Sequence, residues 1–280
     1  MTFPLSIVLS TQPAQFQAVA FKGDLAANLA KIAAWGYDGV ELAIRDPRLI
    51  DAGELSALVA ARRLAVPAIG TGQAWGEERL SFSDPDRAVR RAAVERALSH
   101  IPLARQLNAV IIIGLLRGVL RPGVDAAQAS VWVVDALREV CAAAYRHDAR
   151  IALEPVNRYE TSLVNNVAEG LELIEEVKAP NLGLLFDTFH ANIEEPSIEA
   201  SLAACGPRLF HVHVADSNRW HPGAGHLDFT RFLAALRATG YTGFVSGEFM
   251  PLPDADTAAQ RGIQHLRAIE TDLWNTKARA

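Results

Sequence analysis

The stretch Ile151-Ala-Leu-Glu-Pro-Val-Asn-Arg-Tyr-Glu160 decides the fold. Its first residues predict a buried strand, because Ile151 and Leu153 face one side of an extended chain and the residues between and after them face the other. The strand ends at Glu154, since Pro155 has no N–H for a neighbouring strand and polar residues follow. A carboxylate is therefore expected at the carboxyl end of an apolar strand, where burial is costly unless a cation or strong hydrogen-bond donors meet it.

The same pattern recurs along the chain. Three later strands are expected to end near Asp187, His213 and Glu248. The predicted strands cover residues 5–9, 39–43, 65–70, 109–113, 151–154, 182–186, 209–214 and 243–247. The predicted helices cover residues 24–35, 52–62, 84–107, 125–147, 167–177, 197–205 and 228–239, with the last beginning near 256. A polar loop is expected over residues 72–76.

Eight strands that are each followed by a helix predict a single (β/α)8 TIM barrel of the α/β class. The length of 280 residues suits one such domain over residues 1–280, and no linker or change of composition divides it. An open, doubly wound sheet is the competing fold. It would require a glycine-rich phosphate-binding turn after the first strand, and the sequence has none there.

Composition excludes several classes of partner. The net charge of -5 gives no electrostatic reason to expect nucleic acid or an anionic membrane surface. No apolar run approaches the roughly 20 residues of a membrane helix, and the amino terminus does not resemble a secretory leader. Cys141 and Cys205 lie in alanine-rich helical stretches and are expected to be buried, reduced thiols. A cytoplasmic protein is therefore expected; its oligomeric state is left open, with a dimer or a tetramer as candidates.

The strand-end residues predict a metal site. Active sites of TIM barrels lie at the carboxyl ends of the strands, so Glu154, Asp187, His213 and Glu248 are expected to converge from four neighbouring strands. Each alone would be an ordinary polar residue facing a loop, but four at one level favour a site. Three carboxylates and one imidazole suit a single divalent cation, with Mn²⁺ expected and Mg²⁺ or Co²⁺ as alternatives to it.

Four further polar residues lie near these positions. His211 precedes His213 by two residues and faces the same way, one layer deeper, which favours a supporting role over direct ligation. His190, Arg219 and Glu160 fall on loops beyond the strand ends, from which they could reach substrate oxygens. By spacing alone, Arg219 and Glu160 would be read as solvated loop charges.

Several motifs together carry a family resemblance. They are Glu154-Pro-Val-Asn-Arg-Tyr-Glu160, Asp187-Thr-Phe-His190, His211-Val-His213, Asp216-Ser-Asn-Arg219, Gly225-His-Leu-Asp228 and Gly247-Glu248. They resemble the ketose 3-epimerases, such as D-tagatose 3-epimerase, of the xylose isomerase-like barrel superfamily, over nearly the whole chain. A closer likeness to the 5-keto-L-gluconate epimerases of inositol catabolism rests on four other stretches: Phe21-Lys-Gly-Asp24, Ala43-Ile-Arg-Asp-Pro47, Ile69-Gly-Thr-Gly-Gln73 and Val214-Ala-Asp-Ser-Asn-Arg-Trp220.

The resemblance implies a metal-dependent isomerase that inverts a carbon next to a ketone through an enediolate. In the family, the residues matching Glu154 and Glu248 ligate the metal and act as acid and base from opposite faces of the substrate. His190 and Arg219 match residues that hold substrate oxygens, and Glu160 matches one beside the oxygen of the reacting carbonyl.

The expected substrate is a keto-uronate such as 5-keto-L-gluconate or D-tagaturonate. Its carboxylate would need a cation, and Lys22, Arg45 and Arg117 lie at or just beyond the ends of the first, second and fourth strands. Each of these three could equally be a solvated loop charge. Gln73, on the polar loop after the third strand, is a further substrate-binding candidate.

Other functions stay open. A ketose 3-epimerase acting on neutral sugars such as D-tagatose or D-psicose would use the same centre, and so would an aldose–ketose isomerase such as hydroxypyruvate isomerase. A DNA-repair enzyme like endonuclease IV resembles the chain at Asp187–His190, but its zinc cluster needs histidines after the third and fourth strands, and residues 70–73 and 114–117 contain none. A non-catalytic sugar-binding protein would not need two carboxylates beside the metal.

Overall fold

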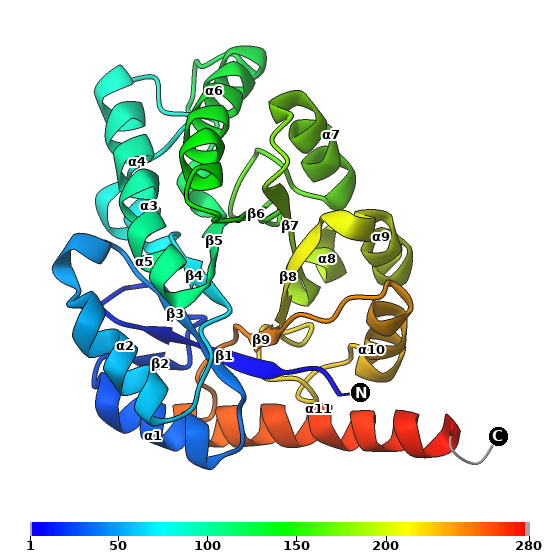
Figure 1. Cartoon of the computed structure of the whole chain (residues 1–280). Helices are drawn as coiled ribbons and strands as arrows, with labels where there is room; N and C mark the ends of the chain where they lie inside the picture. The colour runs from blue at the N-terminus through cyan, green and yellow to red at the C-terminus, as the bar shows by residue number, and fades with distance from the viewer. Residues whose placement is uncertain (1, 278–280) are drawn as a thin grey trace.

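The computed structural model describes residues 2–277, which form a closed barrel of parallel strands surrounded by helices (Figure 1). The strands are β1 Leu5–Ser10, β2 Phe21–Lys22, β3 Gly39–Ala43, β4 Ala68–Gly70, β5 Val110–Ile113, β6 Ile151–Leu153, β7 Leu182–Asp187, β8 Leu209–Val214 and β9 Val245–Gly247. The barrel closes because β1 pairs with both β3 and β9. The two-residue strand β2 pairs with the carboxyl end of β1. The predicted (β/α)8 barrel is confirmed.

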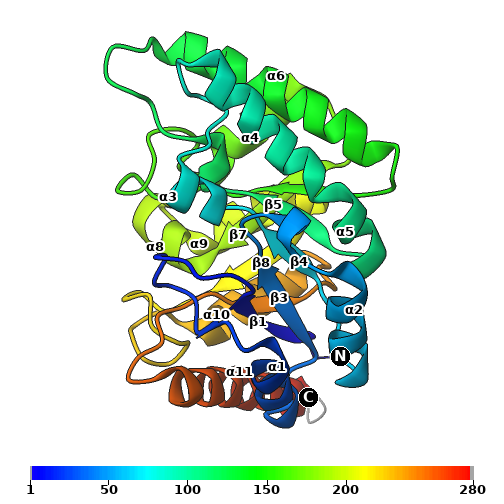
Figure 2. The same cartoon turned by 90° about the vertical axis from the view of Figure 1, so that its left-hand side faces the viewer.

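Helices form the outer layer (Figures 1 and 2). They are α1 Leu25–Ala34, α2 Ala52–Ala61, α3 Gln73–Glu78, α4 Arg87–Ser99, α5 Ile101–Leu107, α6 Ala126–Tyr145, α7 Val167–Val177, α8 Thr188–Glu194, α9 Ile198–Cys205, α10 Phe229–Ala238 and α11 Ala255–Lys277. Three short 3-10 helices are η1 Pro47–Leu49, η2 Leu115–Arg117 and η3 Gly206–Arg208. Several helices begin where a side-chain oxygen accepts a first-turn N–H, as Asp51, Asp125 and Asp228 do.

The prediction of one helix over residues 84–107 is wrong: the segment forms two helices, α4 and α5, with a break at His100. Pro102 lies in the first turn of α5, where its missing N–H costs nothing, whereas inside a longer helix its ring would clash with a preceding carbonyl. The buried His100 ring marks the break. Its nitrogens lie 2.8 Å from the Arg96 carbonyl oxygen and 3.0 Å from that of Ile44, so the break is tied to the end of β3.

Two segments read as loops are helical. The loop expected at residues 72–76 lies mostly within α3. The segment that follows β7 is α8, which starts directly at Asp187 because that carboxylate accepts the N–H of Phe189 at 2.7 Å and of His190 at 3.4 Å. As a result His190 is held in the first turn of a helix.

The inside of the barrel is apolar on one side and polar on the other. A cluster of buried side chains fills the part next to β4–β7: Ala68, Val110, Ile112, Ala152 and Leu185. Across from it, Glu41 and His211 are buried inside the barrel, together with Ser6 and Ser246. Buried polar groups need partners, so this polar side requires its own explanation.

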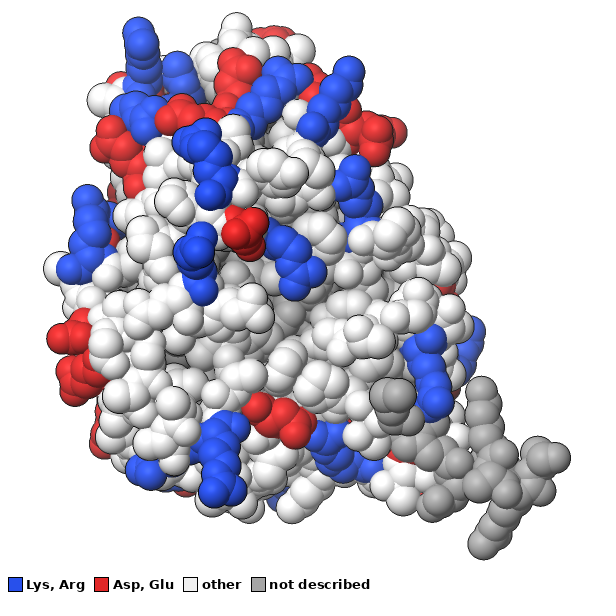
Figure 3. Space-filling view, viewed as in Figure 1, with Lys and Arg blue, Asp and Glu red and all other residues white. Residues whose placement is uncertain are grey.

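The outer surface shows no extended basic area on the face seen in Figure 3. Lys and Arg side chains there alternate with Asp and Glu, mostly toward the edge of the face. Within residues 2–277, no helix combines the length and apolar character that crossing a membrane requires. Cys141 and Cys205 are buried free thiols, as expected, and burial raises the pKa of each to about 12.

Candidate metal centre and substrate cavity

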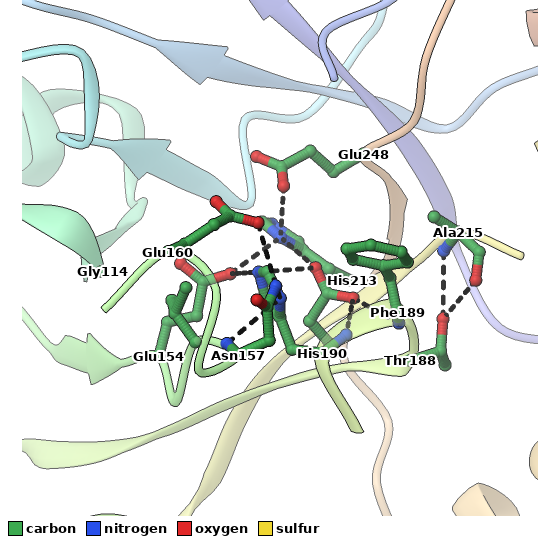
Figure 4. A network of polar contacts seen from close by, with 12 residues as sticks. Gly114, Glu154, Asn157, Glu160, Thr188, Phe189, His190, His213, Ala215 and Glu248 are labelled. Atoms are coloured by element: carbon green, nitrogen blue, oxygen red, sulfur yellow. Dashed lines mark hydrogen bonds and ion pairs between the residues drawn. The ribbon is translucent and has the colours of Figure 1, made fainter. Parts of the chain in front are cut away.

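The carboxyl ends of β6, β7, β8 and β9 bring four polar side chains together. One donor atom from each of Glu154, Asp187, His213 and Glu248 lies within 4.8 Å of the others. Nδ1 of His213 is 3.7 Å from Glu154 Oε1 and 3.8 Å from both Asp187 Oδ2 and Glu248 Oε2. Figure 4 shows Glu154 and Glu248 approaching the His213 ring from different directions.

Two atoms in this cluster have no hydrogen-bond partner although they are buried. They are Oδ2 of Asp187 and Nδ1 of His213. A buried polar atom without a partner costs about 1–3 kcal/mol, so a site that leaves two of them facing one another is incomplete. A divalent cation would satisfy both, and three carboxylates with one imidazole suit Mn²⁺ or Mg²⁺. The residues present therefore fit one divalent cation.

Without a cation, the pKa values of the carboxyl groups in the cluster are shifted from their ordinary values. Burial, together with repulsion from Glu248, raises the pKa of Glu154 to about 8. Burial likewise raises the pKa of Glu248 to about 7, with Asp187 acting in the same direction. Burial also opposes the charge of Asp187, but the rings of His190 and His213 hold the pKa of this carboxyl well below its usual range. Glu154 and Glu248 therefore hold protons near neutral pH in the absence of a cation.

Gly114 makes room for one of these carboxylates. It follows β5 next to β6, and a Cβ atom added there would collide with Oε2 of Glu154. A glycine at this position therefore lets the Glu154 carboxylate approach the neighbouring backbone closely (Figure 4).

A hydrogen-bond network extends from the cluster to the cavity. The side-chain nitrogen of Asn157 donates to His190 Nδ1 at 2.8 Å and to Glu160 Oε1 at 2.9 Å. Arg219 Nη1 donates to the same Glu160 oxygen at 2.6 Å. Burial lowers the pKa of His190 to about 4, so the ring is neutral, and its Nε2 lies 3.8 Å from Glu154 Oε1.

The loop after β8 positions Arg219. Asp216 at its start accepts the N–H groups of Ser217, Gly223 and Leu227, which fixes the loop. Arg219 itself has a φ of 62°. Its guanidinium lies over the rings of Phe16 and Phe189, 5.2 and 4.7 Å from their centres, and its Nη2 is 3.6 Å from Glu248 Oε2.

A cavity with an empty volume of about 730 Å³, counting the part open to solvent, lies above this network. Its side opposite the carboxylate cluster is formed by β1, β3, β4 and the segments that follow them, and it includes Val8, Phe16, Val19, Ala43, Thr71 and Gln73. Gln73 Nε2 donates to Ser10 Oγ at 2.7 Å, whereas its Oε1 is buried without a partner. Among the described residues that line the cavity, Arg219 is the single arginine or lysine.

The structure brings the predicted residues Glu160, His190, Arg219 and Gln73 to this cavity. It does not bring the three predicted carboxylate-binding cations there.

Arg117 is fully buried, and its guanidinium donates to the carbonyl oxygens of Leu163, Gly114, Glu154 and Val164 at 2.5–3.0 Å. Four of its five N–H groups therefore hold backbone together, and the side chain does not line the cavity.

Lys22 and Arg45 also lie outside the cavity lining. The Lys22 ammonium donates to the carbonyl oxygen of Ala14 at 2.9 Å on the surface. Arg45 pairs with Glu78 at 3.5 Å. Neither side chain is therefore directed to the cavity: the partner of Lys22 lies in the segment between β1 and β2, and that of Arg45 lies in α3.

Sequence reasoning missed Glu41 and Asn157. Glu41 lies in the middle of β3, is 1% exposed, and bonds to both His211 and His213. The signal was a single acid within the apolar run Gly39–Ala43, on the same strand face as Ala43. Asn157 lies in the motif that follows Glu154, where a single amide on an expected loop gives no sign of its partners His190 and Glu160.

Comparison with known proteins places the chain in a family. A family model described as a xylose isomerase-like TIM barrel matches residues 29–269. The chain belongs to this family. Within it, the chain is 31% identical to the L-ribulose 3-epimerase of Mesorhizobium japonicum over 261 residues, 92% of this chain and 85% of that protein. It is also 31% identical to the ketose 3-epimerase of Arthrobacter globiformis over 242 residues, 85% of this chain and 81% of that protein.

A solved structure extends the likeness. The D-allulose 3-epimerase from Methylomonas sp., in complex with D-allulose, matches with a TM-score of 0.79 and 27% identity, covering 96% of this chain and 99% of that one. These relatives are named as epimerases of carbohydrates. The present chain is likewise an isomerase of the carbohydrate epimerase class. They do not show the closer likeness to 5-keto-L-gluconate epimerases.

Proposed function

We propose that this chain is a metal-dependent ketose 3-epimerase whose substrates are neutral ketoses. The metal would be held by Glu154, Asp187, His213 and Glu248, whose donor atoms lie within 4.8 Å of one another. Glu154 and Glu248 would be the two catalytic residues. Neutral sugars, the alternative to a keto-uronate, agree better with the cavity and with the names of the relatives.

The observation that carries the choice of substrate is the absence of a free cation. Among the described residues lining the cavity, Arg219 is the single lysine or arginine, and it is already bonded to Glu160 and close to Glu248. A substrate carboxylate would need paired hydrogen bonds from such a group. The side of the cavity opposite the cluster instead offers acceptors, Gln73 and Glu77, which suit the hydroxyl groups of a neutral sugar.

The reaction needs a proton removed from one face of a carbon and another delivered to the opposite face. A divalent cation bound at the cluster would act as a Lewis acid on the ketone oxygen and so make the adjacent C–H more acidic. One of the two carboxylates, Glu154 or Glu248, takes that proton, and the electron pair of the broken C–H bond enters the enediolate of the substrate. The other carboxyl group then forms a new C–H bond from the far face, which inverts the carbon.

The surrounding residues hold the substrate during these transfers. Neutral His190 presents an Nε2–H toward the cluster, where it can donate to a substrate oxygen. Arg219 and Glu160, joined by a 2.6 Å bond, supply a paired donor and acceptor beside it. The rings of Phe16 and Phe189, over which the guanidinium lies, help to hold Arg219 in place.

Turnover on a panel of sugars tests the proposal. The protein, loaded with Mn²⁺, would be assayed on D-psicose, D-tagatose and L-ribulose and on 5-keto-L-gluconate and D-tagaturonate. We expect the neutral ketoses to have the higher kcat/KM and, in deuterated water, to gain one solvent deuteron at the inverted carbon. A higher kcat/KM for the acids would overturn the choice of substrate. An aldose product would indicate the aldose–ketose isomerase alternative.

Variants test the two-carboxylate mechanism. Glu154→Gln and Glu248→Gln should each abolish inversion, because each removes a group that carries a proton. Asp187→Asn should lose most of the bound metal. Glu172→Gln, at an exposed position of α7, is the matched control and should retain native activity. Inversion that persists in either catalytic variant would contradict the mechanism.

A further inference from the structure

Glu41 lies beneath the metal cluster and joins two histidines. Its carboxylate is 2.9 and 3.0 Å from His213 Nε2 and 2.8 Å from His211 Nε2. All three side chains are at least 98% buried, and the two rings meet edge to face with centres 5.3 Å apart. The three residues come from β3 and β8, which are not neighbours in the barrel, so the contact crosses its interior.

Glu41 contacts Nε2 of His213, whereas the other ring nitrogen, Nδ1, faces the metal cluster. An ionised carboxylate has acceptors and no donor, so the His213 Nε2 that contacts it must carry a proton. In a neutral imidazole the other nitrogen, Nδ1, then has a free lone pair. Nδ1 is the atom that lies 3.7–3.8 Å from Glu154, Asp187 and Glu248 and has no hydrogen-bond partner.

We infer that Glu41 is a positioning residue, which holds His213 in the tautomer and orientation that a metal requires. The inference rests on the metal centre of the proposed function. Without the carboxylate, the ring could carry its proton on Nδ1, and that nitrogen could no longer ligate a cation. Partners of this kind behind a ligating histidine commonly change metal affinity by 10- to 100-fold when they are replaced.

His211 competes for the same carboxylate. It lies one layer deeper than His213 on β8, and its Nε2 donates to Glu41 Oε2. The same oxygen is 3.0 Å from His213 Nε2. A carboxylate has enough acceptor positions for both rings. A glutamine in the same place has one oxygen, so only one histidine could be fully satisfied and the other would face an N–H₂ group.

This competition gives a specific test. Glu41→Gln should weaken Mn²⁺ binding, measured by titration calorimetry, by about 10- to 100-fold. His211→Phe should leave binding close to native. The double variant Glu41→Gln/His211→Phe should regain most of the lost affinity, because the glutamine oxygen is then available to His213 alone. Glu270→Gln, which changes a buried glutamate that bonds to Phe3 and Arg267 far from the cluster, is the matched control.

A second measurement reads the tautomer without metal or turnover. The ¹⁵N chemical shifts of His213 in the metal-free protein, at a pH where the ring is neutral, should show the proton on Nε2 in the native chain and a mixture of tautomers in Glu41→Gln. Unchanged shifts would overturn the inference, as would native Mn²⁺ affinity in Glu41→Gln. Equal losses of affinity in Glu41→Gln and Glu270→Gln would also overturn it, since the effect would then be a general one of removing buried charge.

The two proposals fail in different ways. A native protein that binds no divalent cation, or that turns over no ketose, would overturn the proposed function. The tautomer measurement would still decide the role of Glu41, because it depends only on the metal-free ring.

Discussion

Asn157 decides which nitrogen of His190 carries the proton. Its side-chain nitrogen lies 2.8 Å from His190 Nδ1, and its own orientation is fixed because Oδ1 accepts the N–H of Tyr159 at 2.9 Å and Nδ2 also donates to Glu160. Nδ1 of the neutral ring is therefore the acceptor, and Nε2, on the side of the cluster, is the donor.

Reversing this bond should impair catalysis. In Asn157→Asp the carboxylate can only accept, so His190 would carry its proton on Nδ1 and present a lone pair to the substrate. We expect kcat/KM for the best ketose to fall about 100-fold, as for the loss of one catalytic hydrogen-bond donor. The ¹⁵N shifts of His190 would report the tautomer directly. Native kcat/KM together with a reversed tautomer would show that the Nε2–H does not contribute.

Metal binding should release protons. The pKa values of Glu154 and Glu248, raised to about 8 and 7 in the metal-free cluster, mean that these carboxyls hold protons near pH 7. A cation must displace at least one of these protons, while the proposed mechanism keeps one on the carboxyl that acts as the acid. The sign follows: Mn²⁺ affinity rises from pH 6 to pH 8 and falls on acidification. Calorimetry in buffers of different ionisation enthalpy measures the protons released. Binding without proton release, and with constant affinity over this range, would contradict the prediction.

Arg117 should matter for stability and leave the choice of substrate unchanged. Arg117→Met removes all donors to four buried carbonyl oxygens, and we expect a loss of about 3–5 kcal/mol in the free energy of unfolding. Denaturant unfolding measures it. The ratio of kcat/KM for a keto-uronate to that for a neutral ketose should stay at its native value. A selective loss of the acid substrate would instead restore Arg117 as a carboxylate-binding residue.

Gln73 should recognise a substrate hydroxyl group. Ser10 Oγ donates to the Gln12 carbonyl at 2.6 Å and accepts from Gln73 Nε2, so the unpartnered Oε1 of Gln73 stays an acceptor. Gln73→Met should lower kcat/KM for a ketose about 10-fold, and should have no such effect on the one deoxy analogue that lacks the bonded hydroxyl. Gln106→Met, on the outer helix α5, is the control. Equal losses for all deoxy analogues would indicate a packing role.

The convergence of the four strand-end residues could be predicted from the sequence because of periodicity. In a closed parallel barrel all strands end at the same rim, so a polar residue that terminates an apolar strand, such as Glu154 or His213, points to a shared site. This prediction does not depend on how far apart the strand-end residues lie in the sequence.

The remaining features depend on information that a single strand does not contain. Whether the cation of Arg117 faces the cavity or the backbone depends on the path of residues 163–164, which lie far along the chain. The role of Glu41 depends on the contact between β3 and β8 across the barrel, and strand patterns do not give that register. The break at His100 similarly depends on a contact with Ile44.

The cavity has two sides with separate origins. The carboxylate cluster comes from β6–β9, whereas the opposite side comes from β1, β3, β4 and α3. If the proposed function holds, a protein engineer can therefore diversify Val8, Phe16, Val19, Ala43 and Gln73 to admit longer, shorter or branched sugars and leave the proposed proton-transferring groups unchanged. The same separation allows gene duplicates to acquire new substrates through the first half of the chain while the second half keeps its chemistry.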